Sequence, residues 1–164
     1  ESGPWVRRWT GGGKVAHGAR NETTFSLGIP LQSTSAMMRS SMLYREIHQR
    51  IQRILQSSGV SCHLEHESRR SASGDSCFEN PVTFDVINSS CGSKIVGGAQ
   101  RRTRLGFLHQ GSIHCPQLPP DFNVNLARDL SFNVEMRKLG EQVESAALDL
   151  ARVKYSTSQW RLRK

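Results

Sequence analysis

The sequence KIVGGAQRR, residues 94–102, continues through a basic turn into LGFLHQGS, residues 105–112. We expect a strand to begin at Lys94, a turn over residues 101–104 and another strand over residues 105–113. Gly97 and Gly98 have no Cβ, so the backbone there can come close to a ligand. Lys94 can then place a cation beside whatever that backbone approaches.

A second glycine-rich stretch, RRWTGGG at residues 7–13, is expected to form the other wall of the same site. Three successive glycines do not suit the interior of a helix or a strand, so residues 11–13 predict a loop. His17 follows shortly after, and Cys77 lies between the two stretches in the sequence. A cysteine, a lysine and glycine loops in one small chain favour acyl chemistry over phosphate chemistry.

The clearest helix signal covers residues 43–55, where apolar residues recur at three- and four-residue steps opposite a polar face. A second helix is expected over residues 139–153. Other strands are expected over residues 5–10, 14–17, 23–29, 60–64, 82–87 and 122–126. We expect the strand over residues 23–29 to pair with the segment just before it. The strand over residues 82–87 is expected to pair with the one that begins at Lys94.

The chain is basic, with a formal net charge of +8 carried mostly by Arg. This balance predicts acidic partners, namely nucleic acid, an anionic membrane or an acidic protein. An ordinary arginine-rich surface is the alternative. No basic strand with interleaved aromatic residues appears, so nucleic acid is unlikely. No run approaches the roughly 18–20 apolar residues that a membrane span needs, and no signal-peptide pattern is present.

Four cysteines, at positions 62, 77, 91 and 115, contain no C-x-x-C pair, which argues against a zinc ribbon. The histidines are scattered, so no metal site is expected. Without a secretion signal, we expect free thiols and a cytoplasmic location. The length fits a single domain over residues 1–164.

Three separated stretches resemble the lipoate–protein ligase family. They are RRxTGGGxVxH at residues 7–17, KIxGxAQ at residues 94–100 with Gly111-Ser112, and the terminal pattern from Ala147 to Trp160. The pair Cys77-Phe78 is similar, more narrowly, to the cysteine-dependent octanoyltransferase branch. The resemblance covers almost the whole chain. It implies an α/β (α+β) fold, with a largely antiparallel sheet flanked by helices, as in the related biotin ligases.

The chain departs from the family pattern in three places. Family members carry several dozen residues before the first stretch, including a strand of the sheet, so the resemblance implies that the N-terminal part of the domain is missing here. Gly98 stands where Ser is usual. His109-Gln110 reverses the common Gln-His order, which moves an imidazole to the other face of the strand.

By this resemblance, Cys77 is the expected nucleophile, and Lys94 is the cation that stabilises the oxyanion of acyl transfer. The alternatives are an inert, half-buried thiol and a surface lysine at a strand start. The substrate-binding residues that the resemblance implies are Arg8, Thr10, Gly11, Gly12, Gly13, His17, Gly97, Gly98 and Ala99. The glycine loop is otherwise a simple hairpin turn. His17 either orients or deprotonates an incoming amine, or is a strand histidine held by a hydrogen bond.

The function that the resemblance implies is that of an octanoyltransferase of protein lipoylation. Cys77 takes octanoyl from acyl carrier protein as a thioester. A lysine of a lipoyl domain or of the glycine-cleavage H protein then accepts it, and no cofactor is needed. One alternative is an ATP-dependent lipoate–protein ligase that forms lipoyl adenylate, in which Lys94 holds the phosphate. The other is a non-catalytic relative that binds nucleic acid or an acidic protein.

Overall fold

The computed structural model describes residues 6–18, 21–68 and 78–162. Their contacts fall into two compact units, residues 10–133 and a smaller unit that combines residues 1–9 with residues 134–164. The single domain over residues 1–164 that the length favours therefore stays a prediction.

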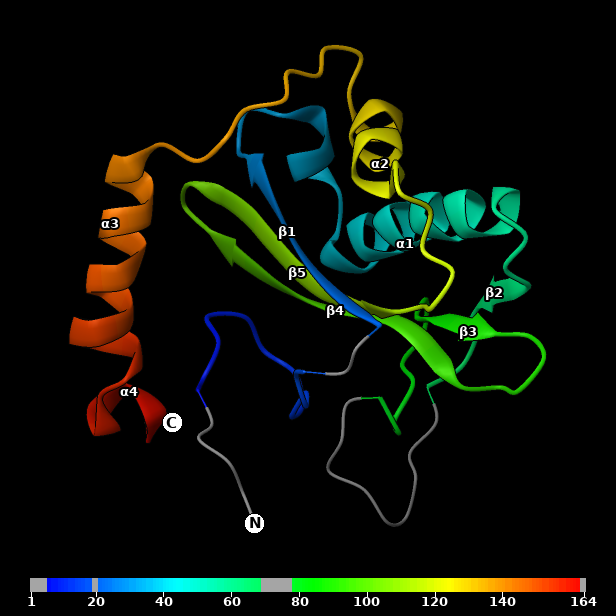
Figure 1. The fold of residues 1–164 in the computed structure, drawn as a ribbon, viewed down its shortest axis with the longest axis horizontal. Helices are drawn as coiled ribbons and strands as arrows, with labels where there is room; N and C mark the ends of the chain where they lie inside the picture. Colours follow the sequence, from blue (N-terminus) through cyan, green and yellow to red (C-terminus); the bar gives the residue numbers. More distant parts are fainter. Residues whose placement is uncertain (1–5, 19–20, 69–77, 163–164) are drawn as a thin grey trace. The chain divides into compact units, whose positions relative to one another are not determined.

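Five antiparallel strands form the sheet of the larger unit, in the order β1-β5-β4-β3-β2 (Figure 1). Their bounds are Glu22–Pro30 for β1, Cys62–Leu64 for β2, Val86–Asn88 for β3, Lys94–Thr103 for β4 and Gly106–His114 for β5. The central hairpin is formed by β4 and β5, with Gly98 opposite Gly111. The antiparallel sheet flanked by helices is thus confirmed, as are the strand start at Lys94 and the pairing of β3 with β4.

Strand β1 pairs with β5, from Glu22 opposite His114 to Pro30 opposite Gly106. The expected hairpin between this strand and the segment before it is therefore wrong. The alternation of apolar and polar residues shows that a strand has one buried face, but it does not show which other strand it pairs with. Three other strand predictions are also wrong. Residues 6–10 form no strand, residues 14–17 form no strand beyond a single bridge at Lys14, and residues 82–85 form an irregular turn before β3 begins.

Helix α1, Ser40–Ser57, follows the short helix η1, Thr34–Met37, and covers one face of the sheet. Its apolar stripe is buried as expected, through Leu43, Ile47, Ile51, Ile54 and Leu55. These residues pack with inward-facing strand residues, which are Val86, Val96, Phe107 and Ile113. The hydrophobic core therefore lies on the α1 side of the sheet, and the opposite face can carry polar groups.

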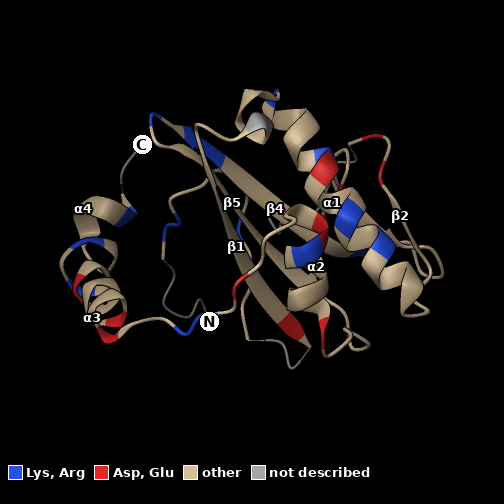
Figure 2. Ribbon diagram, turned by 90° about the horizontal axis from the view of Figure 1, so that it is seen from above, with Lys and Arg blue, Asp and Glu red and all other residues tan. Residues whose placement is uncertain are grey.

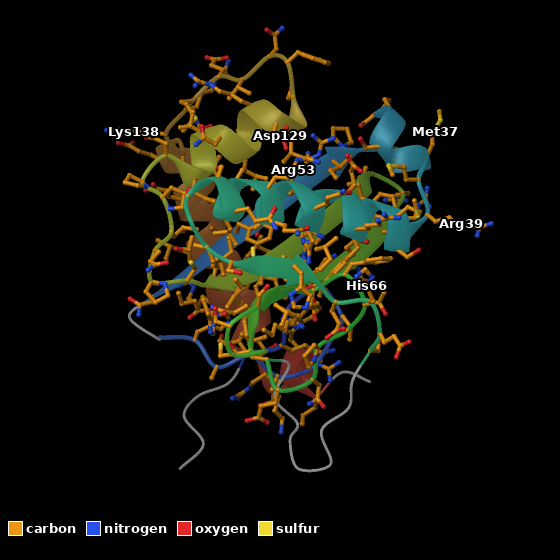
Figure 3. All side chains as sticks on the ribbon, turned by 90° about the vertical axis from the view of Figure 1, so that its right-hand side faces the viewer. Met37, Arg39, Arg53, His66, Asp129 and Lys138 are labelled. Atoms are coloured by element: carbon orange, nitrogen blue, oxygen red, sulfur yellow. The ribbon has the colours of Figure 1, made fainter. Side chains whose placement is uncertain are left out.

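Residues 122–126 belong to helix α2, Phe122–Leu130, and not to the extended segment expected there. Phe122 and Leu126 are four residues apart, so a helix turns both to the same side, and both are buried. Helix α2 packs on α1. Arg53 of α1 donates to Asp129 of α2 over 3.0 Å at the surface (Figure 3).

The smaller unit contains helix α3, Glu141–Leu150, which continues into the π-helical turn η2, Ala151–Tyr155, and helix α4, Ser158–Arg161. The second expected helix is thus confirmed. Trp9 and Trp160 stack with their ring centres 5.2 Å apart and 6° between the planes. The Lys154 ammonium lies 4.2 Å from the Trp9 ring centre. The indole N–H of Trp160 donates to the carbonyl of Arg7 over 2.7 Å.

Candidate functional site

Alternate residues of β5 point to the face of the sheet opposite α1. Ile113 belongs to the core, so Gln110, Ser112 and His114 point to the other side. His109 is on the core side with 0% exposure. The reversed order of His109 and Gln110 therefore has the consequence expected from the sequence, because the imidazole lies away from the polar face.

The glycine loop over residues 11–13 is attached to this polar face through Thr10, the residue that precedes it. Thr10 is buried, and its hydroxyl donates to the side-chain oxygen of Gln110 over 3.2 Å. Gly12 has a φ of 95°, in the left-handed region that favours glycine. Gly11, Gly12 and Gly13 are exposed. The loop therefore has an exposed backbone next to the polar face, as a substrate-lining wall requires.

Glu22 joins the polar residues at the end of β5. Its Oε1 lies 2.6 Å from Nδ1 of His17 and accepts from the Ser112 hydroxyl over 3.1 Å. The same oxygen lies 3.6 Å from Nε2 of His114. Burial alone would raise the pKa of Glu22, but the Gly18 N–H, the His17 ring and the Ser112 hydroxyl together lower it. A carboxylate with 5% of its side chain exposed thus holds the ring of His17, whose side chain is 60% exposed.

Lys94 is buried and paired. Its Nζ lies 2.8 Å from Oδ2 of Asp85, and the two side chains are 1% and 0% exposed. The same ammonium lies 5.3 Å from the ring centre of Phe78. Phe78 in turn stacks on His114, with ring centres 3.9 Å apart. Phe78 therefore links the Lys94–Asp85 pair to the Glu22 cluster, and the alternative of a surface lysine does not hold.

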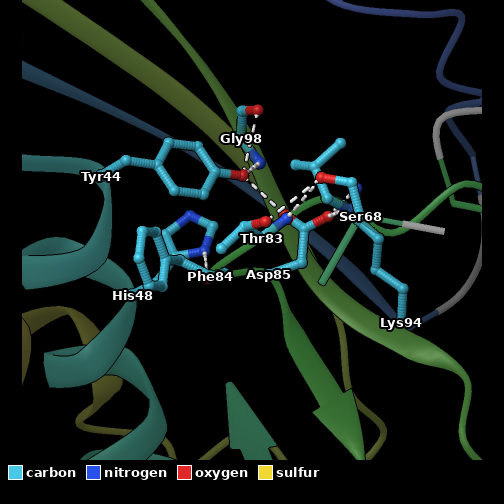
Figure 4. Close-up of polar contacts among 9 residues, drawn as sticks. Tyr44, His48, Ser68, Thr83, Phe84, Asp85, Lys94 and Gly98 are labelled. Carbon is cyan, nitrogen blue, oxygen red and sulfur yellow. Dashed lines mark hydrogen bonds and ion pairs between the residues drawn. The ribbon is translucent and has the colours of Figure 1, made fainter. Parts of the chain in front are cut away.

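Asp85 has more partners than Lys94 alone (Figure 4). Its Oδ2 accepts from the Val82 N–H over 2.7 Å, and its Oδ1 accepts from the Tyr44 hydroxyl over 2.6 Å. Burial raises the pKa of Asp85 above its ordinary value, and Lys94, Tyr44 and Val82 offset only part of this rise. We consider the carboxylate ionised, because three donors converge on it.

Tyr44 also binds the backbone of β4. Its oxygen accepts from the Gly98 N–H over 2.9 Å and lies 3.2 Å from the Gly98 carbonyl oxygen. The Gly98 N–H is thus already bound inside the protein, and the substrate-binding role expected of Gly98 stays a prediction. Sequence reasoning missed both Tyr44 and Asp85. The available signal was one acidic residue inside the apolar run VTFDVI, residues 82–87.

The space beside the paired glycines is filled by the protein's own side chains. A Cβ on Gly97 would lie 2.1 Å from Cε of Lys94. A Cβ on Gly98 would lie 2.6 Å from Nε2 of His109. These glycines make room for the side chains of Lys94 and His109, and the close approach to a ligand expected from the sequence stays a prediction. Two of the departures from the family pattern are thus physically linked, because the buried His109 ring needs a glycine at position 98.

For the remaining predicted site residues, the structure gives little information about a role in the site. Ala99 is buried in β4. Arg8 belongs to the smaller unit, so its role stays a prediction. Cys77 lies outside the described residues, and its role also stays a prediction. The described cysteines, Cys62, Cys91 and Cys115, are free thiols.

Within residues 6–18, 21–68 and 78–162, no three or more His, Cys, Asp or Glu side chains form a cluster that could hold a metal ion. No helix in these ranges has the length and apolar character that crossing a membrane requires.

Comparisons with known proteins agree with the resemblance seen in the sequence. The sequence model of the lipoyl protein ligase A/B catalytic domain matches residues 1–144. Octanoyltransferase LipM of Oceanobacillus iheyensis is 32% identical over 125 residues, which cover 76% of this chain and 42% of that protein. Octanoyltransferase LipM of Kyrpidia tusciae is 32% identical over 115 residues, 66% of this chain and 40% of that protein. The chain thus spans less than half the length of these relatives.

Solved structures share the fold. A lipoate-protein ligase A bound with ATP superimposes with a TM-score of 0.69 at 19% identity, over 94% of this chain and 70% of that one. A bi-partite lipoate protein ligase from Thermoplasma acidophilum gives a TM-score of 0.64 at 20% identity, over 97% and 71% of the two chains. At these identities the likeness supports the architecture alone.

Proposed function

This chain belongs to the lipoyl protein ligase A/B catalytic domain family, and from that membership we propose that it transfers octanoyl groups in protein lipoylation. The octanoyltransferases at 32% identity support this reaction over the ATP-dependent ligase. The observation that carries the proposal is the contact of Phe78 with the buried Lys94 ammonium, because Phe78 directly follows Cys77 in the chain.

In the first half of the proposed reaction, the Cys77 thiolate attacks the carbonyl carbon of an octanoyl thioester on acyl carrier protein. A new C–S bond forms, the original C–S bond breaks, and the carrier's thiol leaves with the proton that Cys77 gave up. Attack on a thioester needs little activation because the leaving group is itself a thiolate. The Lys94 ammonium stabilises the charge that develops on the carbonyl oxygen.

In the second half, the amine of a lysine on a lipoyl domain or glycine-cleavage H protein attacks the Cys77 thioester. An amide C–N bond forms to the octanoyl carbonyl carbon, the C–S bond breaks, and Cys77 leaves as a thiolate ready for the next cycle. The amine must lose a proton, and His17 is the proposed acceptor. Its Nδ1 faces Glu22, which leaves Nε2 as the nitrogen that takes the proton. The exposed ring suits contact with a partner protein. Glu22 then stabilises the protonated imidazole.

The charge distribution supports acidic partner proteins. Residues 23–45 and 86–120 contain no Asp or Glu. The basic residues Arg39, Arg101, Arg102 and Arg104 are exposed. Figure 2 shows blue along the end of the sheet where β4 turns into β5. A positive surface attracts acidic carrier proteins and accelerates their encounter, an effect that salt weakens. Such carriers imply that the chain acts in the cytoplasm.

The test is the intact mass of the chain after mixing with octanoyl-acyl carrier protein without ATP. We expect an octanoyl adduct that hydroxylamine removes and that maps to Cys77. The Cys77→Ser variant should show no such adduct, and Cys91→Ser is the matched control because Cys91 is exposed in a turn. A folded chain without an adduct contradicts the proposal. Lipoyl transfer from lipoate and ATP that survives Cys77→Ala would instead establish the ligase, with ATP as its co-substrate.

A further inference from the structure

We propose that Tyr44 and Asp85 are positioning residues that hold the Lys94 ammonium in place from the helix side of the sheet. The inference rests on the proposed function only in taking Lys94 as the cation of the reaction. Tyr44 comes from α1, Asp85 from the turn before β3, and Lys94 from the start of β4. Three elements that are distant in the sequence thus meet at one charged group (Figure 4).

The two oxygens of Asp85 have different partners. Oδ2 binds Lys94 and the Val82 N–H, and Oδ1 binds the Tyr44 hydroxyl. A lysine side chain is a flexible four-carbon stem that rotates readily. Because the Asp85 side chain has 0% exposure, water cannot take the place of a lost hydrogen-bond partner, and losing a partner leaves a buried charge uncompensated. The carboxylate therefore defines one position for the ammonium.

Tyr44 connects this carboxylate to the strand that carries Lys94. A hydroxyl has one proton, and the shorter contact of 2.6 Å assigns it to Asp85 rather than to the Gly98 carbonyl. The hydroxyl oxygen in turn accepts the Gly98 N–H over 2.9 Å. Tyr44 thus fixes Asp85 and the backbone of β4 relative to each other. That stretch of backbone includes Gly97, the residue against which the Lys94 stem packs.

Backbone strain just before Asp85 supports a positioning role. Phe84 has a φ of 75°, which is unfavourable for a bulky residue. Two hydrogen bonds hold it there: its N–H donates to the Glu65 carbonyl over 2.8 Å, and its carbonyl lies 2.8 Å from Nδ1 of His48. An irregular register between Val86 and Ile87 follows. The chain is therefore bent on both sides of Asp85, which turns this side chain toward Lys94.

The first arm of the test is kinetic and uses a double-mutant cycle. We expect Asp85→Asn to slow acyl-enzyme formation roughly 100-fold, as loss of a preorganised oxyanion contact does, and Tyr44→Phe to slow it about tenfold. In a Lys94→Met background, Asp85→Asn should cause no further loss, because Asp85 acts through Lys94. Asp129→Asn and Tyr155→Phe are matched controls that should keep the wild-type rate. An equal loss in both backgrounds would overturn the proposal.

The second arm does not need activity. Lys94 is buried, so an amine-acetylating reagent followed by mass spectrometry should label it slowly in the wild type. Asp85→Asn and Tyr44→Phe should each raise its labelling rate, while Lys138 serves as an exposed reference. If Tyr44→Phe has a native circular dichroism spectrum and the labelling rate of Lys94 is unchanged, the inference is wrong. If the wild type forms no acyl-enzyme, the proposed function fails, and this labelling still decides the positioning role.

Discussion

His109 should make the stability of this chain fall as the pH drops below 6.5. Its side chain has 0% exposure, and burial lowers its pKa from 6.5 to about 4. Between these values the unfolded chain binds a proton that the folded chain does not, so the free energy of unfolding decreases as the pH decreases. With 1.36 kcal/mol for each pKa unit, the loss due to His109 is about 2 kcal/mol at pH 5 and about 3 kcal/mol at pH 4.

The assay is urea unfolding followed by circular dichroism, from pH 8 to pH 4, for the wild type and for His109→Gln. The amide of glutamine does not titrate and can still bond to Gln100, which lies 3.1 Å from Nδ1 of His109. His48 is present in both proteins, and its pKa is lowered mainly by burial and also by His109, so the difference between the two proteins includes the loss of this second effect. The wild type should lose about 2 kcal/mol more than the variant between pH 8 and pH 5. Parallel curves for the two proteins would refute the reasoning.

Three further predictions concern the glycines and Glu22. Gly98→Ala should destabilise the fold by about 1–3 kcal/mol, because the new Cβ would lie 2.6 Å from Nε2 of His109. Urea unfolding measures this loss, and in a His109→Ala background most of it should disappear. Gly97→Ala should displace the Lys94 side chain, because the new Cβ would lie 2.1 Å from its Cε. In a single-turnover assay, acyl-enzyme formation should then be roughly 100-fold slower. A wild-type rate would show that the reaction does not need Lys94 in its present position. The pKa of Glu22 is lowered from 4.5, so its contribution to stability is present above that pH and is lost as the pH falls through the folded-state value. Acid unfolding of Glu22→Gln should therefore be less steep below pH 4.5 than that of the wild type, and equal slopes would contradict this assignment.

The sequence by itself determined the parts of this protein whose signals are local. The apolar stripe of α1 repeats within one segment, so its period identifies the helix and its buried face. Residue types over a few positions also predicted two other elements, the strand that begins at Lys94 and the exposed loop over residues 11–13. The family was recognisable because its motifs are short and lie in a fixed order, and the match over residues 1–144 confirms it.

Only the tertiary structure decided how distant residues are combined. The pairing of β1 with β5 depends on competition among strands, which alternation alone does not resolve. Tyr44 and Asp85 are 41 positions apart, and no local pattern predicts that a tyrosine of α1 binds a carboxylate in the turn before β3. The positive φ of Phe84 is imposed by its surroundings against its own preference. Likewise Gly98 is a departure from the family pattern in the sequence, and it becomes explicable only when the buried ring of His109 fills the space beside it.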